Sequence, residues 1–148
     1  MHSFVSCLIH VVFSTKNRHP WITPEIEARL WPYFGGIATK HKMRTIKVGG
    51  VADHIHLLVS IPSTMAIFKV VQLLKGNSSK WIHEEFPDLR EFEWQVGYGA
   101  FSIGVSGVED TVTYIENQAQ HHRRKSFRTE FKQILNKHQL EFEESMLD

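Results

Sequence analysis

The chain has 148 residues, 42% of them hydrophobic, which suffices for one domain with a core and excludes two ordinary domains. Its formal net charge of +1 excludes attraction to polyanions through overall charge, so a nucleic-acid surface would have to come from local clusters of cations. Cys7 is the single cysteine, which excludes an intramolecular disulfide and a thiolate-rich metal site and fits a reducing compartment.

The N-terminal residues lack the charged head and apolar block of a signal peptide. No stretch approaches the roughly 20 apolar residues that a membrane span needs. We therefore expect a soluble protein of the cytoplasm.

The first part of the chain predicts a strand, a helix and two more strands. Apolar side chains on both faces of residues 4–13 predict a central strand. After a polar loop, Thr23 as N-cap and Pro24 in the first turn predict a helix. Residues 44–51 and 54–61 predict two strands joined by a two-residue turn, and therefore a hairpin.

The next part predicts a helix and a fourth strand. Residues 65–74 carry apolar side chains at helical spacing, the polar run 75–80 interrupts them, and residues 93–103 follow as a strand. The order strand, helix, strand, strand, helix, strand is that of a ferredoxin-like (split βαβ) fold of the α+β class. Such a fold has a four-stranded antiparallel sheet with two helices on one face. We expect the first and third strands to be central and the other face to be open.

Two further helices are predicted towards the C-terminus. Ser106 and Glu109 have the spacing of a capping box, which predicts a helix from there to about His121. Tyr114 and Gln118 lie one turn apart on that helix, so their side chains can reach the same point. An amphipathic pattern over residues 127–138 predicts the last helix.

The stretch His54-Ile55-His56 carries the clearest chemistry. Side chains two residues apart share one face of a strand, so both imidazoles can bind one metal ion. The apolar surroundings would hold them on a rigid element, as a catalytic site requires. From the pair alone, a strand that simply carries two histidines is the alternative interpretation, and a second motif has to decide.

Taken together, the motifs resemble the single-tyrosine HUH transposases of small bacterial insertion sequences, the IS200-like and REP-associated tyrosine transposases. The resemblance covers most of the chain. The motifs that carry it are, in chain order, His54-Ile55-His56, Gly97-Tyr98-Gly99-Ala100-Phe101-Ser102, Tyr114-Ile115-Glu116-Asn117-Gln118 and His121-His122-Arg123.

The resemblance implies an enzyme that cuts and rejoins single-stranded DNA. Tyr114 matches the nucleophile that forms a 5′-phosphotyrosine, and His54, His56 and Gln118 match the ligands of a divalent cation. Since the pKa of a free phenol is about 10, attack at neutral pH needs a cation that polarises the phosphate. An oxygen ligand beside two imidazoles favours Mg²⁺ or Mn²⁺, with Zn²⁺ as the alternative.

The resemblance also implies partners. Its members bind DNA hairpins near the element's ends and form homodimers in which the tyrosine helix of one subunit completes the metal site of the other. The flexible connector 104–107 is the only support for helix exchange in the sequence. The side chains expected to contact DNA are Lys16, Arg18, His19, Lys75, Ser78, Lys80, His121, His122, Arg123 and Arg124. Tyr98 and Phe101 would stack on bases or pack in the core.

We accordingly expect a single transposase domain over residues 1–148. It would comprise a sheet with helices (1–103), a tyrosine helix (106–122) and a C-terminal helix with a tail (127–148). Two other functions fit the same residues. One is a hairpin-binding protein that does not cut, and the other is a metal phosphoesterase in which Tyr114 plays no part.

Overall fold

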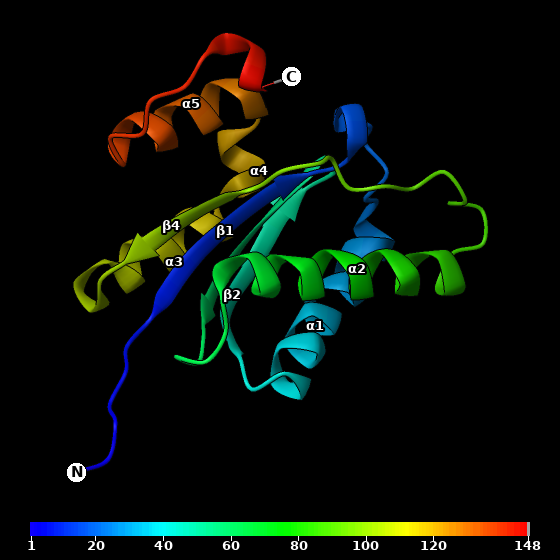
Figure 1. Cartoon of the computed structure of the whole chain (residues 1–148). Coiled ribbons are helices and arrows are strands. Elements are labelled where there is room, and N and C mark those ends of the chain that lie inside the picture. Colours follow the sequence, from blue (N-terminus) through cyan, green and yellow to red (C-terminus); the bar gives the residue numbers. More distant parts are fainter. Residues whose placement is uncertain (148) are drawn as a thin grey trace.

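The computed structural model describes residues 1–147, and its centre is a four-stranded antiparallel sheet (Figure 1). The strands are β1 (Leu8–Ser14), β2 (Arg44–Val51), β3 (His54–Ser60) and β4 (Gly99–Ile103), in the order β2-β3-β1-β4. β1 and β3 are therefore central, as predicted. β2 and β3 form the expected hairpin. The expected tail reached residue 148, which lies outside the described residues.

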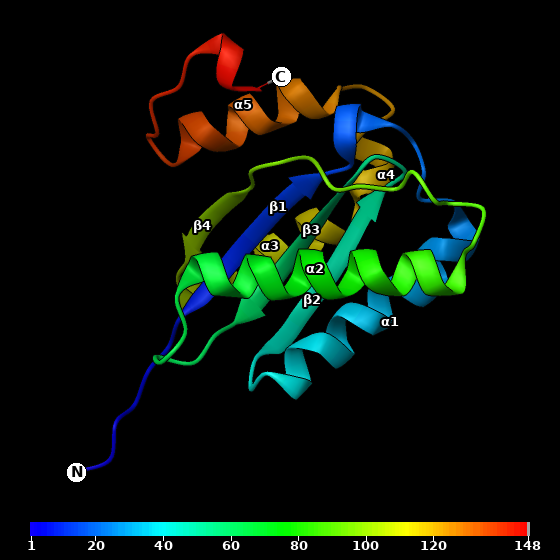
Figure 2. The same cartoon turned by 45° about the vertical axis from the view of Figure 1, so that its right-hand side comes forward.

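Helices α1 (Pro24–Lys40) and α2 (Ile67–Glu85) cover one face of the sheet (Figure 2). Thr23 caps α1, because its side-chain oxygen accepts a hydrogen bond from the backbone N–H of Ile26. The main core lies between these helices and the sheet, and Ile55, Leu57 and Val59 of β3 belong to it. Since side chains alternate along a strand, His54 and His56 lie on the opposite face, which agrees with the prediction.

The predicted break in the second helix is wrong, because α2 runs without interruption through residues 75–80. The Ser78 hydroxyl donates to the carbonyl oxygen of Leu74 at 2.6 Å, and the Asn77 amide donates to that of Leu73 at 2.9 Å. These bonds accommodate two poor helix formers. The small Ser78 side chain also accepts the Trp94 indole N–H at 3.0 Å inside the core.

The predictions for the first and the last strand were both too long. β1 begins at Leu8 rather than Phe4, because its neighbours β3 and β4 offer partners only as far as Ser60 and Ile103. The predicted strand 93–103 is reduced to β4, preceded by a single bridge between Thr15 and Trp94. Gly97, with a φ of 94°, interrupts extended backbone between that bridge and β4.

The predicted tyrosine helix is two helices, α3 (Val108–Glu116) and α4 (Gln118–His121), separated at Asn117. The capping box does not form, because a 3₁₀ turn, η2 (Val105–Gly107), precedes α3 and Gly107 takes the N-cap position. α5 (Phe127–Lys137) matches the predicted last helix, and Ser126 caps it. The remaining 3₁₀ turns are η1 (Lys16–Arg18) and η3 (Glu144–Leu147).

The second face of the sheet is not open, contrary to expectation. α3 and α4 lie behind the sheet, and α5 crosses above its upper end (Figures 1 and 2). A small apolar cluster joins α5 to the sheet through Val12, Phe101 and Ile134. The amphipathic C-terminal helices bury their apolar stripes here, because the sheet offers them the nearest apolar surface. Among residues 1–147, no helix is long and apolar enough to cross a membrane.

Candidate metal and catalytic centre

The two histidines of β3 present the same ring nitrogen to the same point. Nδ1 of His54 lies 2.8 Å from an oxygen of Asp53, and Nδ1 of His56 lies 2.8 Å from Nε2 of His10. Each of these contacts fixes the orientation of its ring, and a partner at Nδ1 is the usual arrangement of a metal-binding histidine. Nε2 of both rings is thereby directed away from the sheet.

Oxygen atoms from two other elements meet these Nε2 atoms. Glu130 of α5 places Oε1 2.9 Å from Nε2 of His56 and 3.5 Å from Nε2 of His54. Gln118 of α4 places Oε1 3.0 Å from Nε2 of His54. The other oxygen of Glu130 lies 3.0 Å from Nε2 of His122. Three elements of the chain, β3, α4 and α5, therefore converge on one point.

Tyr114 of α3 borders the same point. Its ring centroid lies 5.6 Å from that of His56 and 6.2 Å from that of His10. The Gln118 amide donates to the Tyr114 carbonyl oxygen at 3.5 Å, which ties the two residues across the break at Asn117. The position of the tyrosine depends on Gly49 of β2, where a Cβ atom would lie 2.6 Å from the carbonyl oxygen of Ile115. Only glycine lets α3 approach the sheet so closely.

The positive and negative charges in the cluster lie next to each other and stabilise one another. Burial lowers the pKa of His54, but hydrogen bonds with Asp53 and Glu130 outweigh burial and raise it to about 9. Burial is the main cause that lowers the pKa of His56 to about 4. Burial raises the pKa of Glu130, but hydrogen bonds with both histidines hold it well below its ordinary value. At neutral pH the cluster therefore holds a cationic His54, a neutral His56 and an ionised Glu130.

The phenol of Tyr114 is not activated in this arrangement. Burial, and then a hydrogen bond with the Glu130 carboxylate, raise the pKa of Tyr114 well above its ordinary value. A carboxylate beside a phenol opposes the second negative charge that a phenolate would bring. Deprotonation of Tyr114 near neutral pH therefore requires an additional positive charge at this point.

The donor set fits a divalent cation. One ligand atom each from His54, His122 and Glu130 lie within 4.8 Å of one another, and His56 and Gln118 add a third imidazole and a neutral oxygen. Imidazoles together with oxygen donors suit Mn²⁺. Two histidines with one glutamate are also a known catalytic zinc set, so the structure makes Zn²⁺ a stronger alternative than the sequence did.

The cluster is shielded from solvent. His54 and His56 are both 0% exposed, and Gln118 and Glu130 are almost as deeply buried. Every buried polar side-chain atom of the described residues has a hydrogen-bond partner. The cluster is thus a satisfied polar network beneath α5, rather than a set of histidines sealed among apolar side chains.

The side chains expected to contact DNA have several different surroundings. Ser78 is fully buried in the core, which removes it from any DNA surface. The Lys75 ammonium donates to the carbonyl oxygens of Gln95 and Gly97 at 2.6 and 2.9 Å, so it anchors the loop before β4. Lys16 forms an exposed ion pair with Glu93.

The remaining expected contacts divide between the cluster and the surface. His122 belongs to the buried cluster through Glu130, and the His121 ring lies 4.8 Å from that of Tyr114. Arg18 is partly buried beside a cavity described below. His19, Lys80, Arg123 and Arg124 are exposed.

Sequence reasoning missed Glu130, Asp53 and the role of His10. Glu130 did carry a signal, because it lies between Phe127 and Ile134 at positions that continue the apolar stripe of α5. A carboxylate on the buried face of a helix needs a polar partner. Asp53 carried no comparable signal, since it lies in a turn. His10 could be placed beside the histidine strand on the same face of the sheet, but its contact with His56 depends on the register of strand pairing.

Comparison with known proteins gives a consistent result. The model of a family described as IS200-like transposases matches residues 3–118. The transposase of insertion sequence element IS200 from Salmonella typhimurium is 30% identical over 127 residues, which cover 80% of this chain and 81% of the relative. The ISDra2 transposase TnpA of Deinococcus radiodurans is 31% identical over 114 residues, which cover 74% of this chain and 81% of the relative.

Two solved structures share the fold. A crystal structure of a candidate transposase from Deinococcus radiodurans R1 superposes with a TM-score of 0.66 at 24% identity, covering 80% of this chain and 95% of that chain. The structure of a REP-associated tyrosine transposase bound to a REP hairpin superposes with a TM-score of 0.62 at 12% identity. The match covers 82% of this chain and 72% of that chain. The family match ends at Gln118, so α5 and Glu130 lie beyond it.

Proposed function

We propose that this chain, which belongs to the IS200-like transposase family, cleaves and rejoins single-stranded DNA through a covalent bond between Tyr114 and a 5′ phosphate. Family membership accounts for DNA transposition as the activity. The nucleophile, the divalent metal and the DNA hairpin substrate are parts of the proposal. The observation that carries it is the convergence of Tyr114 with Nε2 of His54 and His56 on one buried polar point.

In the proposed reaction the Tyr114 oxygen attacks phosphorus and its proton is lost. The bond from phosphorus to the 3′ oxygen breaks, and that oxygen leaves as a hydroxyl after taking up a proton. The covalent phosphotyrosine conserves the energy of the phosphodiester, so that a 3′-hydroxyl can later attack it and rejoin the strand. A tyrosine nucleophile therefore suits transfer of DNA better than its simple hydrolysis.

His54, His56 and Gln118 would hold the divalent cation, Mg²⁺ or Mn²⁺, and Glu130 is placed to act as a further oxygen ligand. When bound, the cation would supply the positive charge that the phosphate and the developing phenolate need. With the cation bound, Asp53 and His10 would hold the two imidazoles in the tautomer that presents an Nε2 lone pair to it.

Entry of DNA requires part of the structure to move. Both histidines are inaccessible to solvent, so a phosphate can reach them only if α5 separates from the sheet or shifts along it. The contact that holds α5 is a small apolar cluster together with the Glu130 hydrogen bonds. We propose that hairpin DNA binds to a form in which α5 has moved.

The direct test is covalent capture of DNA. Labelled single strands copied from the DNA that flanks the gene, incubated with protein and Mn²⁺, should give a protein–DNA adduct that survives denaturing electrophoresis. Tyr114→Phe should abolish the adduct and leave the fold unchanged. Tyr33→Phe, which changes a tyrosine packed on Trp81 away from the site, is the matched control and should retain it.

Two results would overturn the proposal. Tight binding of these strands without an adduct would indicate a hairpin-binding protein that does not cut. Metal-dependent hydrolysis that survives Tyr114→Phe would indicate a phosphoesterase.

A further inference from the structure

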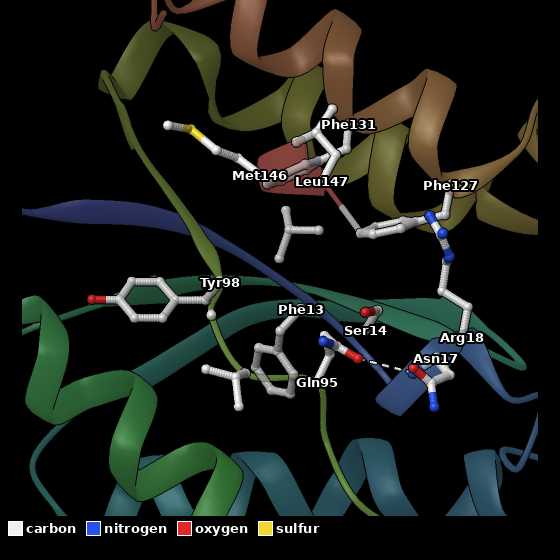
Figure 3. Close-up of a pocket in the computed structure, with 13 residues that line it drawn as sticks. Phe13, Ser14, Asn17, Arg18, Gln95, Tyr98, Phe127, Phe131, Met146 and Leu147 are labelled. Atoms are coloured by element: carbon white, nitrogen blue, oxygen red, sulfur yellow. Dashed lines mark hydrogen bonds between the residues drawn. The ribbon is translucent and has the colours of Figure 1, made fainter. Parts of the chain in front are cut away.

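A cavity of about 420 Å³ lies next to the candidate centre, between the end of β1, the loop before β4, α5 and the C-terminal residues (Figure 3). Figure 3 shows Phe127 and Phe131 on its upper side, Phe13 and Gln95 on its lower side, and Tyr98 at one end. Neither the metal ligands nor Tyr114 line it. The proposed chemistry therefore leaves this cavity without a role.

Flat apolar groups form much of the cavity wall. The rings of Phe127 and Phe131 are stacked, with centroids 5.5 Å apart and an angle of 18° between their planes. Tyr98 at the end of the cavity is 43% exposed, and Val96 beside it is 93% exposed. Exposed apolar side chains around a hollow are typical of a binding site for a flat, weakly polar ligand.

One edge of the cavity is polar. Asn17 and Gln95 line it, and the backbone N–H of Asn17 donates to Oε1 of Gln95 at 2.9 Å, which fixes the position of that side chain. Side-chain amides offer donors and acceptors that match the edges of nucleobases. Arg18 is the cation among the lining residues.

The cavity lies beside the candidate centre and beside a second, basic hollow. Phe127 lines the cavity, and its ring centroid lies 4.5 Å from that of His54. Ser14, another lining residue, is the cross-strand partner of His54. Arg18 and Phe127 also line the second hollow, which Lys125 and His122 border. Such an arrangement combines an aromatic surface with cations along a path, as single-stranded nucleic acid requires.

We propose that this cavity, formed while α5 lies on the sheet, binds one unstacked base of single-stranded DNA as the first contact, before α5 moves and the neighbouring phosphate reaches His54 and His56. The inference rests on the proposed function and specifies how the same site selects its substrate. Phe127 and Phe131 would stack on the base, and the amides of Asn17 and Gln95 would read its edge. Arg18 would contact a neighbouring phosphate.

The test separates the contribution of bases from that of phosphates. A fluorescent strand of twelve thymidines and a matched strand with abasic sites at every position are titrated with protein in metal-free buffer, where no cleavage occurs. Stacking on one base should make wild-type protein bind the thymidine strand roughly tenfold more tightly than the abasic strand. Phe131→Ala should remove that preference and Tyr98→Ala should reduce it severalfold, whereas Tyr98→Phe should retain it. Arg18→Ala should weaken both strands equally.

Phe4→Ala is the control, because Phe4 is an exposed aromatic residue outside the cavity. A second measurement does not depend on whether the variants fold. Irradiation of the same strand carrying 5-iododeoxyuridine should attach DNA to peptides containing residues 95–98 or 127–131. Attachment of DNA only to other peptides would overturn the proposal. So would an unchanged preference for the thymidine strand in both Phe131→Ala and Tyr98→Ala. Base-dependent binding without any adduct in Mn²⁺ would instead contradict the proposed function and leave the cavity assignment standing.

Discussion

At the scale of single residues, Glu130 is the most informative side chain of the chain. Its carboxylate contacts three imidazoles and the phenol of Tyr114, and it is 2% exposed. An ionised group so deeply buried is tolerated only with opposite charges around it. His54 supplies that charge here, and a bound cation would supply it more strongly.

A substitution at Glu130 should therefore change metal binding. Glu130→Gln keeps the shape of the side chain and removes its charge. We therefore expect the affinity for Mn²⁺ to fall roughly tenfold or more, which is the loss typical when even a hydrogen-bond partner of a metal ligand is changed. Isothermal titration of the DNA-free protein with Mn²⁺ measures this directly. Glu141→Gln, at an exposed position, should leave the affinity unchanged. Equal affinities for wild type and Glu130→Gln would exclude Glu130 as a ligand.

At the scale of elements, the tyrosine helix is positioned by its contact with β2. Gly49 is paired with His56 across the hairpin and lies against the backbone of Ile115 in α3. One glycine thus sets the distance between the helix that carries the nucleophile and the strand that carries the metal ligands.

We expect Gly49→Val to separate the nucleophile from the metal ligands. The added side chain must push α3 away, at a cost of about 1–3 kcal/mol in the free energy of unfolding. Adduct formation should fall at least a hundredfold, because small displacements of a reacting group have large effects on rate. Mn²⁺ affinity should fall much less, since β3 is retained. Gly36→Ala, where an added Cβ meets nothing within 4 Å, is the control. Full adduct formation by Gly49→Val would contradict this role.

α5 is the second element whose position decides activity. Ile134 joins it to Val12 and Phe101, so Ile134→Ala should remove about 2 kcal/mol or more of local packing energy. Amide hydrogen exchange should become faster within α5 and stay slow in β1 and β3. Because the buried centre must open for DNA, adduct formation should also become faster. Slower adduct formation with the sheet intact would show that α5 is needed in its closed position.

At the scale of the whole molecule, the structure and the resemblance make different predictions about subunits. Tyr114 lies beside His56 of its own chain, whereas the resemblance implied a homodimer with the helix exchanged. Exchange would require α3 to leave its close contact with β2 at Gly49. The contacts within the chain therefore support a site completed by its own tyrosine, and the homodimer stays a prediction.

Mixing two inactive variants distinguishes these arrangements. Tyr114→Phe lacks the nucleophile, and a His54→Ala, His56→Ala double variant lacks the metal ligands. If each chain completes its own site, we expect the mixture to remain without adduct at every protein concentration. Adduct formation by the mixture, approaching a quarter or more of the wild-type level, would show that a tyrosine of one subunit serves the histidines of another. Light scattering of the same samples reports whether dimers are present.

Much of the fold follows from local patterns in the sequence. The apolar runs of β1 and β3, the cap at Thr23 and the short turn before His54 each depend on neighbouring residues, and each was predicted. The predicted bounds of helices and strands were wrong where contacts between residues distant in the sequence determine them. Trp94 stabilises Ser78 within α2, and the ends of β3 and β4 determine where β1 begins.

The sequence by itself determined the sheet, the shared face of His54 and His56 and the family, because strand periodicity and motif order are local properties. Only the tertiary structure decided that this face is covered, that Glu130 meets both imidazoles and that His10 and Asp53 orient them. These contacts join residues up to 76 positions apart, at His54 and Glu130. Their formation depends on how α5 packs on the sheet, which no local pattern specifies.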